Sequence, residues 1–160
     1  MATRFTGFST EYDRFRPSPP TILLDTVCSI LSCGSVETVV DLGCGTGLST
    51  RPWATRAGRV IGIDPSEDMI TEARRRTAGG NVEYVFGRGD DIPIPNSGAD
   101  IVTCASSFHW MEPHSALREI ERVLRPEGVF CFYSYQMPPL TPFWQLDDAY
   151  KSFRCRMIEI

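Results

Sequence analysis

A glycine-rich segment that follows a short apolar run is the part of the sequence best suited to hold a ligand. The run ends in Val39-Val40-Asp41-Leu42, and glycine then occupies every second position of the loop. Glycines let the backbone approach a ligand closely and adopt positive φ angles, and backbone amides ahead of a helix face a negative or polar group. The carboxylate of Asp41 is suited to an ammonium group. The candidate binding residues of this segment are Asp41, Gly43, Cys44, Gly45, Thr46 and Gly47.

The spacing of these glycines argues against a dinucleotide-binding loop. That loop has the pattern G-x-G-x-x-G, whereas position 48 of this chain is leucine. A loop built only for a pyrophosphate would also gain little from Asp41, because like charges repel.

Asp64 is a second candidate, about 20 residues further along, after another apolar run, where a carboxylate can accept hydrogen bonds from a ribose diol. Taken alone, Asp64 before Pro65 can also be explained as a helix cap. Its spacing from the glycine loop favours the ribose interpretation.

A third candidate is the acidic segment Gly89-Asp90-Asp91-Ile92-Pro93, which follows a third apolar run. One carboxylate of Asp90 or Asp91 could accept a hydrogen bond from the exocyclic amine of adenine while Ile92 packs on the ring. The alternative is a plain acidic turn, because aspartate and glycine are common turn residues.

Short apolar, β-branched runs alternate with segments of helical periodicity, which predicts a parallel sheet in a doubly wound α/β fold. We expect strands at 36–42, 59–63, 82–86, 99–105 and 129–135, and helices at 20–32, 48–57, 66–77, 113–124 and 143–158. Proline is a poor interior helix residue, so the alternative for 48–57 is a helix that starts late, with Pro52 near its first turn. In such a sheet the carboxyl ends of the strands form the ligand site, and all three candidate segments lie there.

Composition narrows the class of protein. A length of 160 residues suits one domain, and 42% hydrophobic residues can form a core. A net charge of −4 weakens the case for a nucleic-acid binder, and we interpret the run Arg74–Arg76 as a solvated helix face. We find no apolar run of ~18 residues for a membrane helix, no signal peptide and no C-x-x-C pair among six cysteines. We therefore expect a cytoplasmic protein.

Taken together, the candidate segments resemble the class I S-adenosylmethionine-dependent methyltransferase family, in particular its small-molecule, type 11-like branch. Two further stretches fit: Asp100–Trp110 is similar to the family's fourth-strand segment, and Leu117–Gly128 to its next helix and turn. The N-terminal stretch Tyr12–Pro17 resembles the short segment that covers the cofactor.

The resemblance implies a Rossmann-like sheet and a role for each segment. The glycine loop would hold the methionine part of S-adenosyl-L-methionine, Asp64 the ribose, and Asp90, Asp91 and Ile92 the adenine. Where relatives carry Gly-Asp-Ala, this chain has Gly87-Arg88-Gly89, which shifts the expected adenine contact to Asp90 or Asp91. Further residues that it places at the cofactor are Tyr12, Pro65, Met69, Ala105 and Ser106.

The family's sheet has seven strands, whereas we expect five here, so the sheet would be incomplete at its C-terminal end. We divide the expected single domain into a cofactor-covering segment (1–18), a cofactor-binding core (36–135), and a loop with an amphipathic helix (137–160). An open sheet edge would make self-association plausible, although oligomeric state does not follow from the sequence.

The expected activity is methyl transfer from S-adenosylmethionine to a small-molecule acceptor, with no nucleic-acid, membrane or metal partner. A general base is optional in this chemistry; His109 is the best candidate, because its ordinary pKa of ~6.5 suits proton abstraction near neutrality. His109 could instead be a wall of an aromatic pocket beside Trp110. Two alternatives are a non-catalytic or truncated cofactor-binding module and, less favoured, a nicotinamide-dependent oxidoreductase.

Overall fold

The computed structural model describes residues 13, 16–31, 35–78, 80–134 and 148. Within this part of the chain, five strands form one parallel sheet in the order β3-β2-β1-β4-β5. The strands are β1 (Val36–Leu42), β2 (Ala57–Asp64), β3 (Val82–Phe86), β4 (Ala99–Ala105) and β5 (Leu124–Tyr133). The predicted doubly wound α/β fold is confirmed, because the strand order reverses between β1 and β4.

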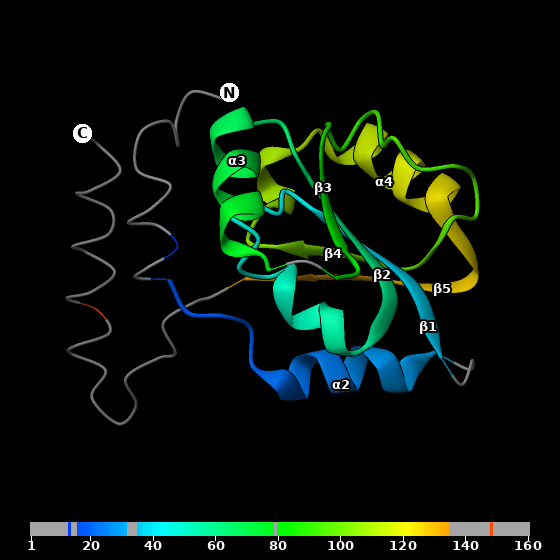
Figure 1. Ribbon diagram of the computed structural model, residues 1–160. Coiled ribbons are helices and arrows are strands. Elements are labelled where there is room, and N and C mark those ends of the chain that lie inside the picture. The colour runs from blue at the N-terminus through cyan, green and yellow to red at the C-terminus, as the bar shows by residue number, and fades with distance from the viewer. Residues whose placement is uncertain (1–12, 14–15, 32–34, 79, 135–147, 149–160) are drawn as a thin grey trace.

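Helices cover both faces of this sheet, and Figure 1 shows α2 and α4 on opposite sides of it. Adjacent residues of a strand point to opposite faces. Val39 accordingly packs with Leu24 and Val27 of α2 (Thr21–Ile30), while Val40 belongs to the core under α4 (Pro113–Val123). The core thus lies in two layers, one on each face of the central strands.

The helix α3 (Glu67–Arg76) begins as its sequence predicts. Ser66 is the N-cap and its hydroxyl accepts a hydrogen bond from Met69 N–H at 3.5 Å. Acidic residues stand in the first turn and arginines in the last, which suits the helix dipole. The Arg74–Arg76 run is exposed, as expected for a solvated helix face.

Two predicted elements need correction. The helix expected at 48–57 is a short 3₁₀ helix, η2 (Arg51–Thr55), because Pro52 at its first turn lacks an N–H and fits only near a helix start. The strand expected at 129–135 begins earlier, at Leu124, and its pairing with β4 shifts register between Ala99 and Ile101.

Three smaller findings complete the comparison with the sequence. The amphipathic helix predicted at 143–158 lies outside the described residues. None of the described helices is long and apolar enough to cross a membrane, and the described residues contain no cluster of metal-binding side chains. Cys104 is buried and Cys131 is partly buried.

Candidate functional site

A cavity of about 330 Å³ opens at the carboxyl ends of β1, β2, β3 and β4. Its lining comes from four segments, between residues 42 and 45, 63 and 69, 87 and 90, and 105 and 112. Each segment directly follows a strand, so the parallel sheet brings together residues that are far apart in sequence. The cavity lies where the strand order reverses, the usual ligand position in an open α/β sheet.

The glycine loop borders this cavity, and all three glycines have positive φ angles of 69°, 54° and 79°. A Cβ at Gly43 would overlap Ser107, and a Cβ at Gly47 would overlap the Tyr84 hydroxyl. These two glycines therefore allow neighbouring segments to pack closely. A Cβ at Gly45 would meet no atom within 4 Å, and Gly45 lines the cavity. Its missing side chain therefore leaves room for a ligand.

Asp64 lines the same cavity and is bound to the glycine loop. One carboxylate oxygen accepts the Gly45 N–H at 2.9 Å, and the other accepts the Ser66 N–H at 2.9 Å. Burial raises the pKa of Asp64, and the two N–H groups partly oppose that shift. An ionised carboxylate has about four acceptor positions, so about half stay available for the hydroxyls of a ligand.

Asp41 is not part of the lining, which corrects the expectation that it contacts an ammonium group. Its side chain is fully buried. One carboxylate oxygen accepts hydroxyl hydrogen bonds from Ser49 and Thr50, each at 2.7 Å, and the other accepts one from Thr103 at 3.0 Å. Burial raises the pKa of Asp41, and the three hydroxyls lower it in part. Asp41 therefore joins the end of β1 to β4 behind the loop.

Only part of the acidic segment after β3 reaches the cavity. Asp90 lines it, and Arg88 donates to both Asp90 carboxylate oxygens, at 2.9 and 3.2 Å, which lowers the pKa of Asp90. Asp91 is outside the lining. Ile92 is buried in the core, and its N–H donates to Glu119 at 2.9 Å. The proposed adenine contact through Ile92 therefore needs correction, because the ring of a ligand in the cavity cannot pack on it.

The segment after β4 forms the remaining wall. Ala105 and Ser106 line the cavity, together with Trp110, whose residue surface is 42% exposed. The Ser107 hydroxyl donates to the Leu42 carbonyl at 2.6 Å and so fixes this segment against the end of β1. Phe108 packs against the core instead.

His109 is exposed and lies outside the lining, so the structure does not place it as a catalytic base. Its ring centre is 4.8 Å from that of Trp110, which does border the cavity. His109 lies in the 3₁₀ helix η3 (Phe108–Trp110), which holds only three residues. So short an element has no repeating pattern from which the direction of the His109 side chain could be predicted. The role of His109 as a general base therefore stays a prediction.

The remaining predicted residues divide into lining and supporting groups. Pro65 and Met69 line the cavity. Cys44 and Thr46 are buried residues of the glycine loop, and Tyr12 lies outside the described residues. Sequence reasoning did not single out Ser66, Gly87, Met111 and Glu112 as lining residues. Their positions one to seven residues after a predicted strand are the signal that could have found them.

The charged side chains of the lining are three carboxylates and one guanidinium, from Asp64, Asp90, Glu112 and Arg88. Glu112 also caps α4: the Ser115 hydroxyl and the N–H groups of Ser115 and His114 lower its pKa to about 2. The lining therefore carries an excess of negative charge near neutral pH. Such a site favours a cationic ligand.

The sequence matches a family model described as a methyltransferase domain over residues 40–132. A "probable S-adenosylmethionine-dependent methyltransferase" of Saccharomyces cerevisiae is 29% identical over 91% of this chain and 51% of its own length. A malonyl-[acyl-carrier protein] O-methyltransferase of Serratia marcescens is 36% identical over 71% of this chain and 45% of its own length.

A solved structure of an S-adenosylmethionine-dependent methyltransferase from Mesorhizobium loti superposes with a TM-score of 0.58. It is 28% identical and covers 68% of this chain and 51% of the solved chain. The chain thus spans about half the length of the relatives it matches. The matched part includes the glycine loop, Asp64 and the segments after β3 and β4.

Proposed function

The chain belongs to the class I S-adenosylmethionine-dependent methyltransferase family, and from this premise we propose that its cavity binds S-adenosylmethionine for methyl transfer to a small-molecule acceptor. The single observation that carries the proposal is the pairing of Gly45 and Asp64. Gly45 leaves open space at the cavity wall, and its N–H holds the Asp64 carboxylate at the same wall.

The described residues fit this cofactor. S-adenosylmethionine carries a sulfonium and an ammonium cation, which the excess of carboxylates in the lining favours. Asp64 keeps acceptor positions for ribose hydroxyls, and Met69 offers an apolar surface beside Pro65 at the same wall. The loop around Gly43 and Gly45 would hold the methionine part.

When bound, S-adenosylmethionine supplies an activated methyl group on its sulfonium centre. The task of the protein is to align the acceptor with that methyl group and to exclude water. Ser106 and Trp110 stand beside the glycine loop because the Ser107 hydroxyl fixes their segment to the Leu42 carbonyl. We assign these residues to the wall that faces the acceptor.

Apart from Asp64, which the proposal assigns to the ribose, the described lining holds no side chain suited to remove a proton from the acceptor near neutral pH. Glu112 has a pKa of about 2, because its carboxylate accepts several hydrogen bonds, and is therefore a weak base. The hydrogen bonds from Arg88 likewise lower the pKa of Asp90. The proposal therefore favours an acceptor that is a nucleophile before it binds, such as a carboxylate or an unprotonated amine.

The test is the release of S-adenosylhomocysteine by the purified chain in the presence of S-adenosylmethionine and panels of carboxylic acids, phenols and amines. Turnover with a carboxylic acid or an amine, and its loss in Gly45→Ala, would support the proposal. Cofactor binding without turnover across all panels would instead support the non-catalytic binding module. A folded chain that neither binds nor turns over the cofactor would refute the assignment of the site.

A further inference from the structure

Asp13 is a buried carboxylate that the proposed function does not use. Its side chain is only 6% exposed. It accepts hydrogen bonds from the Thr46 hydroxyl at 2.8 Å and from Arg51 Nη2 at 2.9 Å, and Arg76 Nη1 is 3.5 Å away. A buried charge is tolerated when it is paired and hydrogen-bonded, and Asp13 meets both conditions through residues far from it in sequence.

The contacts of Asp13 converge on residue 46 of the glycine loop. Asp13 holds the Thr46 hydroxyl directly, and Arg51, held by Asp13, donates through Nη1 to the Thr46 carbonyl at 2.7 Å. The hydroxyl and the carbonyl of Thr46 are therefore both bound by the residues of one ion pair. Thr46 directly follows Gly45, so this ion pair restrains the peptide that borders the cavity.

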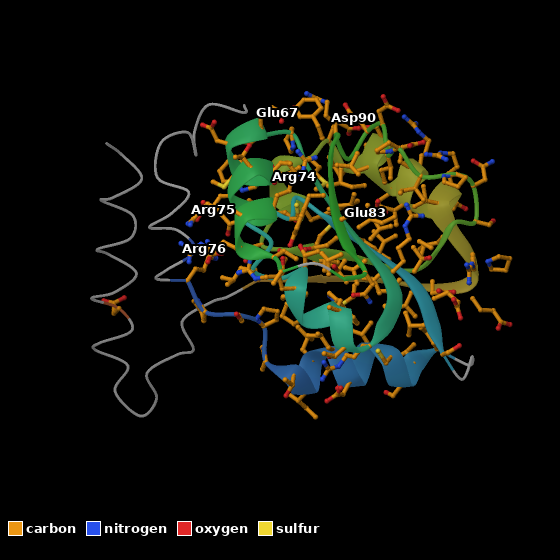
Figure 2. The ribbon with its side chains drawn as sticks, viewed as in Figure 1. Glu67, Arg74, Arg75, Arg76, Glu83 and Asp90 are labelled. Atoms are coloured by element: carbon orange, nitrogen blue, oxygen red, sulfur yellow. The ribbon has the colours of Figure 1, made fainter. Side chains whose placement is uncertain are left out.

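The same carboxylate reaches α3. Arg76, 3.5 Å from Asp13, donates to one carboxylate oxygen of Glu72 at 2.7 Å, and Arg75 donates to both Glu72 oxygens, each at 2.7 Å. Figure 2 shows Glu67 at one end of α3 and Arg76 at the other. The opposite, N-terminal end of α3 holds Ser66 and Met69, which line the cavity. Asp13 therefore connects the loop after β1 with the helix after β2.

Resting on the proposed function, we propose that Asp13 is a positioning residue for the cofactor site. It fixes Thr46 and Arg51 so that the Gly45 N–H stays directed at Asp64. Because Asp13 adds to the hydrogen bonds that hold the loop, cofactor binding and the docking of residue 13 stabilise each other, as linked equilibria require. The docking of Asp13 is thereby coupled to occupancy of the cavity.

The experiment compares S-adenosylhomocysteine affinity in the wild type, Asp13→Asn and Asp25→Asn. Asp25 is a matched control: it is an aspartate of α2 paired with Arg56 at 2.8 Å, and neither residue lines the cavity. We expect Asp13→Asn to raise the dissociation constant about tenfold, within the range for residues that act through neighbours. Asp25→Asn should leave it unchanged.

Two further variants separate positioning from loss of fold. Thr46→Val removes the hydroxyl that donates to Asp13, and Arg51→Gln removes the positive charge paired with Asp13. Each variant should weaken S-adenosylhomocysteine binding in the folded chain. In the double variant, Asp13→Asn should weaken binding little beyond the effect of Arg51→Gln alone. Trypsin cleavage at the Arg14–Phe15 bond is an independent readout. The ligand should protect this bond in the wild type and not in Asp13→Asn.

The failures of the two proposals are distinguishable. If the wild type binds no S-adenosylhomocysteine, the proposed function itself is refuted. If the wild type binds it while Asp13→Asn, Thr46→Val and Arg51→Gln bind equally well, the cofactor site stands and the positioning role of Asp13 is wrong. Equal protection of the Arg14–Phe15 bond in wild type and Asp13→Asn would also contradict the coupling.

Discussion

Comparing Gly45→Ala with Gly80→Ala separates two effects of an added methyl group. One is the strain that it places on the backbone, and the other is the space that it takes from a ligand. Gly45 has φ of 54° and Gly80 has φ of 88°, and a Cβ at either position would meet no atom within 4 Å. Both Gly45→Ala and Gly80→Ala should therefore lose about 1–2 kcal/mol of unfolding free energy from the left-handed backbone alone. For a chain of this size that lowers Tm by about 2–8 °C.

Of these two glycines, Gly45 borders the cavity and Gly80 does not, so the Gly45 variant should lose affinity and the Gly80 variant should keep it. A methyl group in space that the ligand needs has a steric cost of about 1–3 kcal/mol, as overpacking does, which is about 5- to 150-fold in dissociation constant. Calorimetric titration with S-adenosylhomocysteine measures the affinity, and thermal unfolding measures the strain. If Gly45→Ala binds as tightly as Gly80→Ala, the ligand does not approach this part of the loop and the reasoning is refuted.

Three further predictions concern single side chains. Asp64→Ala should weaken S-adenosylhomocysteine binding by about 1.5–3 kcal/mol, the range for hydrogen bonds to a charged group. Because burial raises the pKa of Asp64, the affinity of the wild type should also fall as the pH is lowered through that raised pKa. Asp64→Asn should lack this pH dependence in the same titrations. Burial also raises the pKa of Asp41, so its favourable contribution to folding is present below the ordinary value of 3.8 and is lost as the pH rises through the raised pKa. Urea unfolding should show Asp41→Asn gaining stability relative to the wild type over that rise, and an unchanged difference would contradict the burial argument. His109→Ala should change neither cofactor affinity nor stability by more than about 0.5 kcal/mol, and a large loss of affinity would return His109 to the site.

The strands could be predicted because each is a short apolar run closed by a turn residue. The runs at 36–42, 82–86 and 99–105 match the observed strands. The errors occur where a single proline or an irregular strand pairing decides the backbone. Pro52 restricts the segment after the glycine loop to a 3₁₀ turn, and β5 begins at Leu124 because its first residue pairs with Ala99 across an irregular stretch.

The cavity could be predicted in outline, because residues that follow parallel strands meet at one edge of the sheet. The direction of individual side chains could not. Asp41 and Asp64 both stand near strand ends, yet the hydroxyls of Ser49, Thr50 and Thr103 surround Asp41 behind the loop. The role of Asp13 was also out of reach, because nothing in its spacing indicates that it contacts Thr46, Arg51 and Arg76.

The most direct measurement is calorimetric titration of the purified 160-residue chain with S-adenosylmethionine, S-adenosylhomocysteine and NAD in parallel. The cavity that Gly45 and Asp64 border should bind the first two ligands, at one site per chain, and not NAD. Binding of NAD alone, or no binding of S-adenosylmethionine by a folded chain, would contradict the assignment of this cavity as the methyl-donor site.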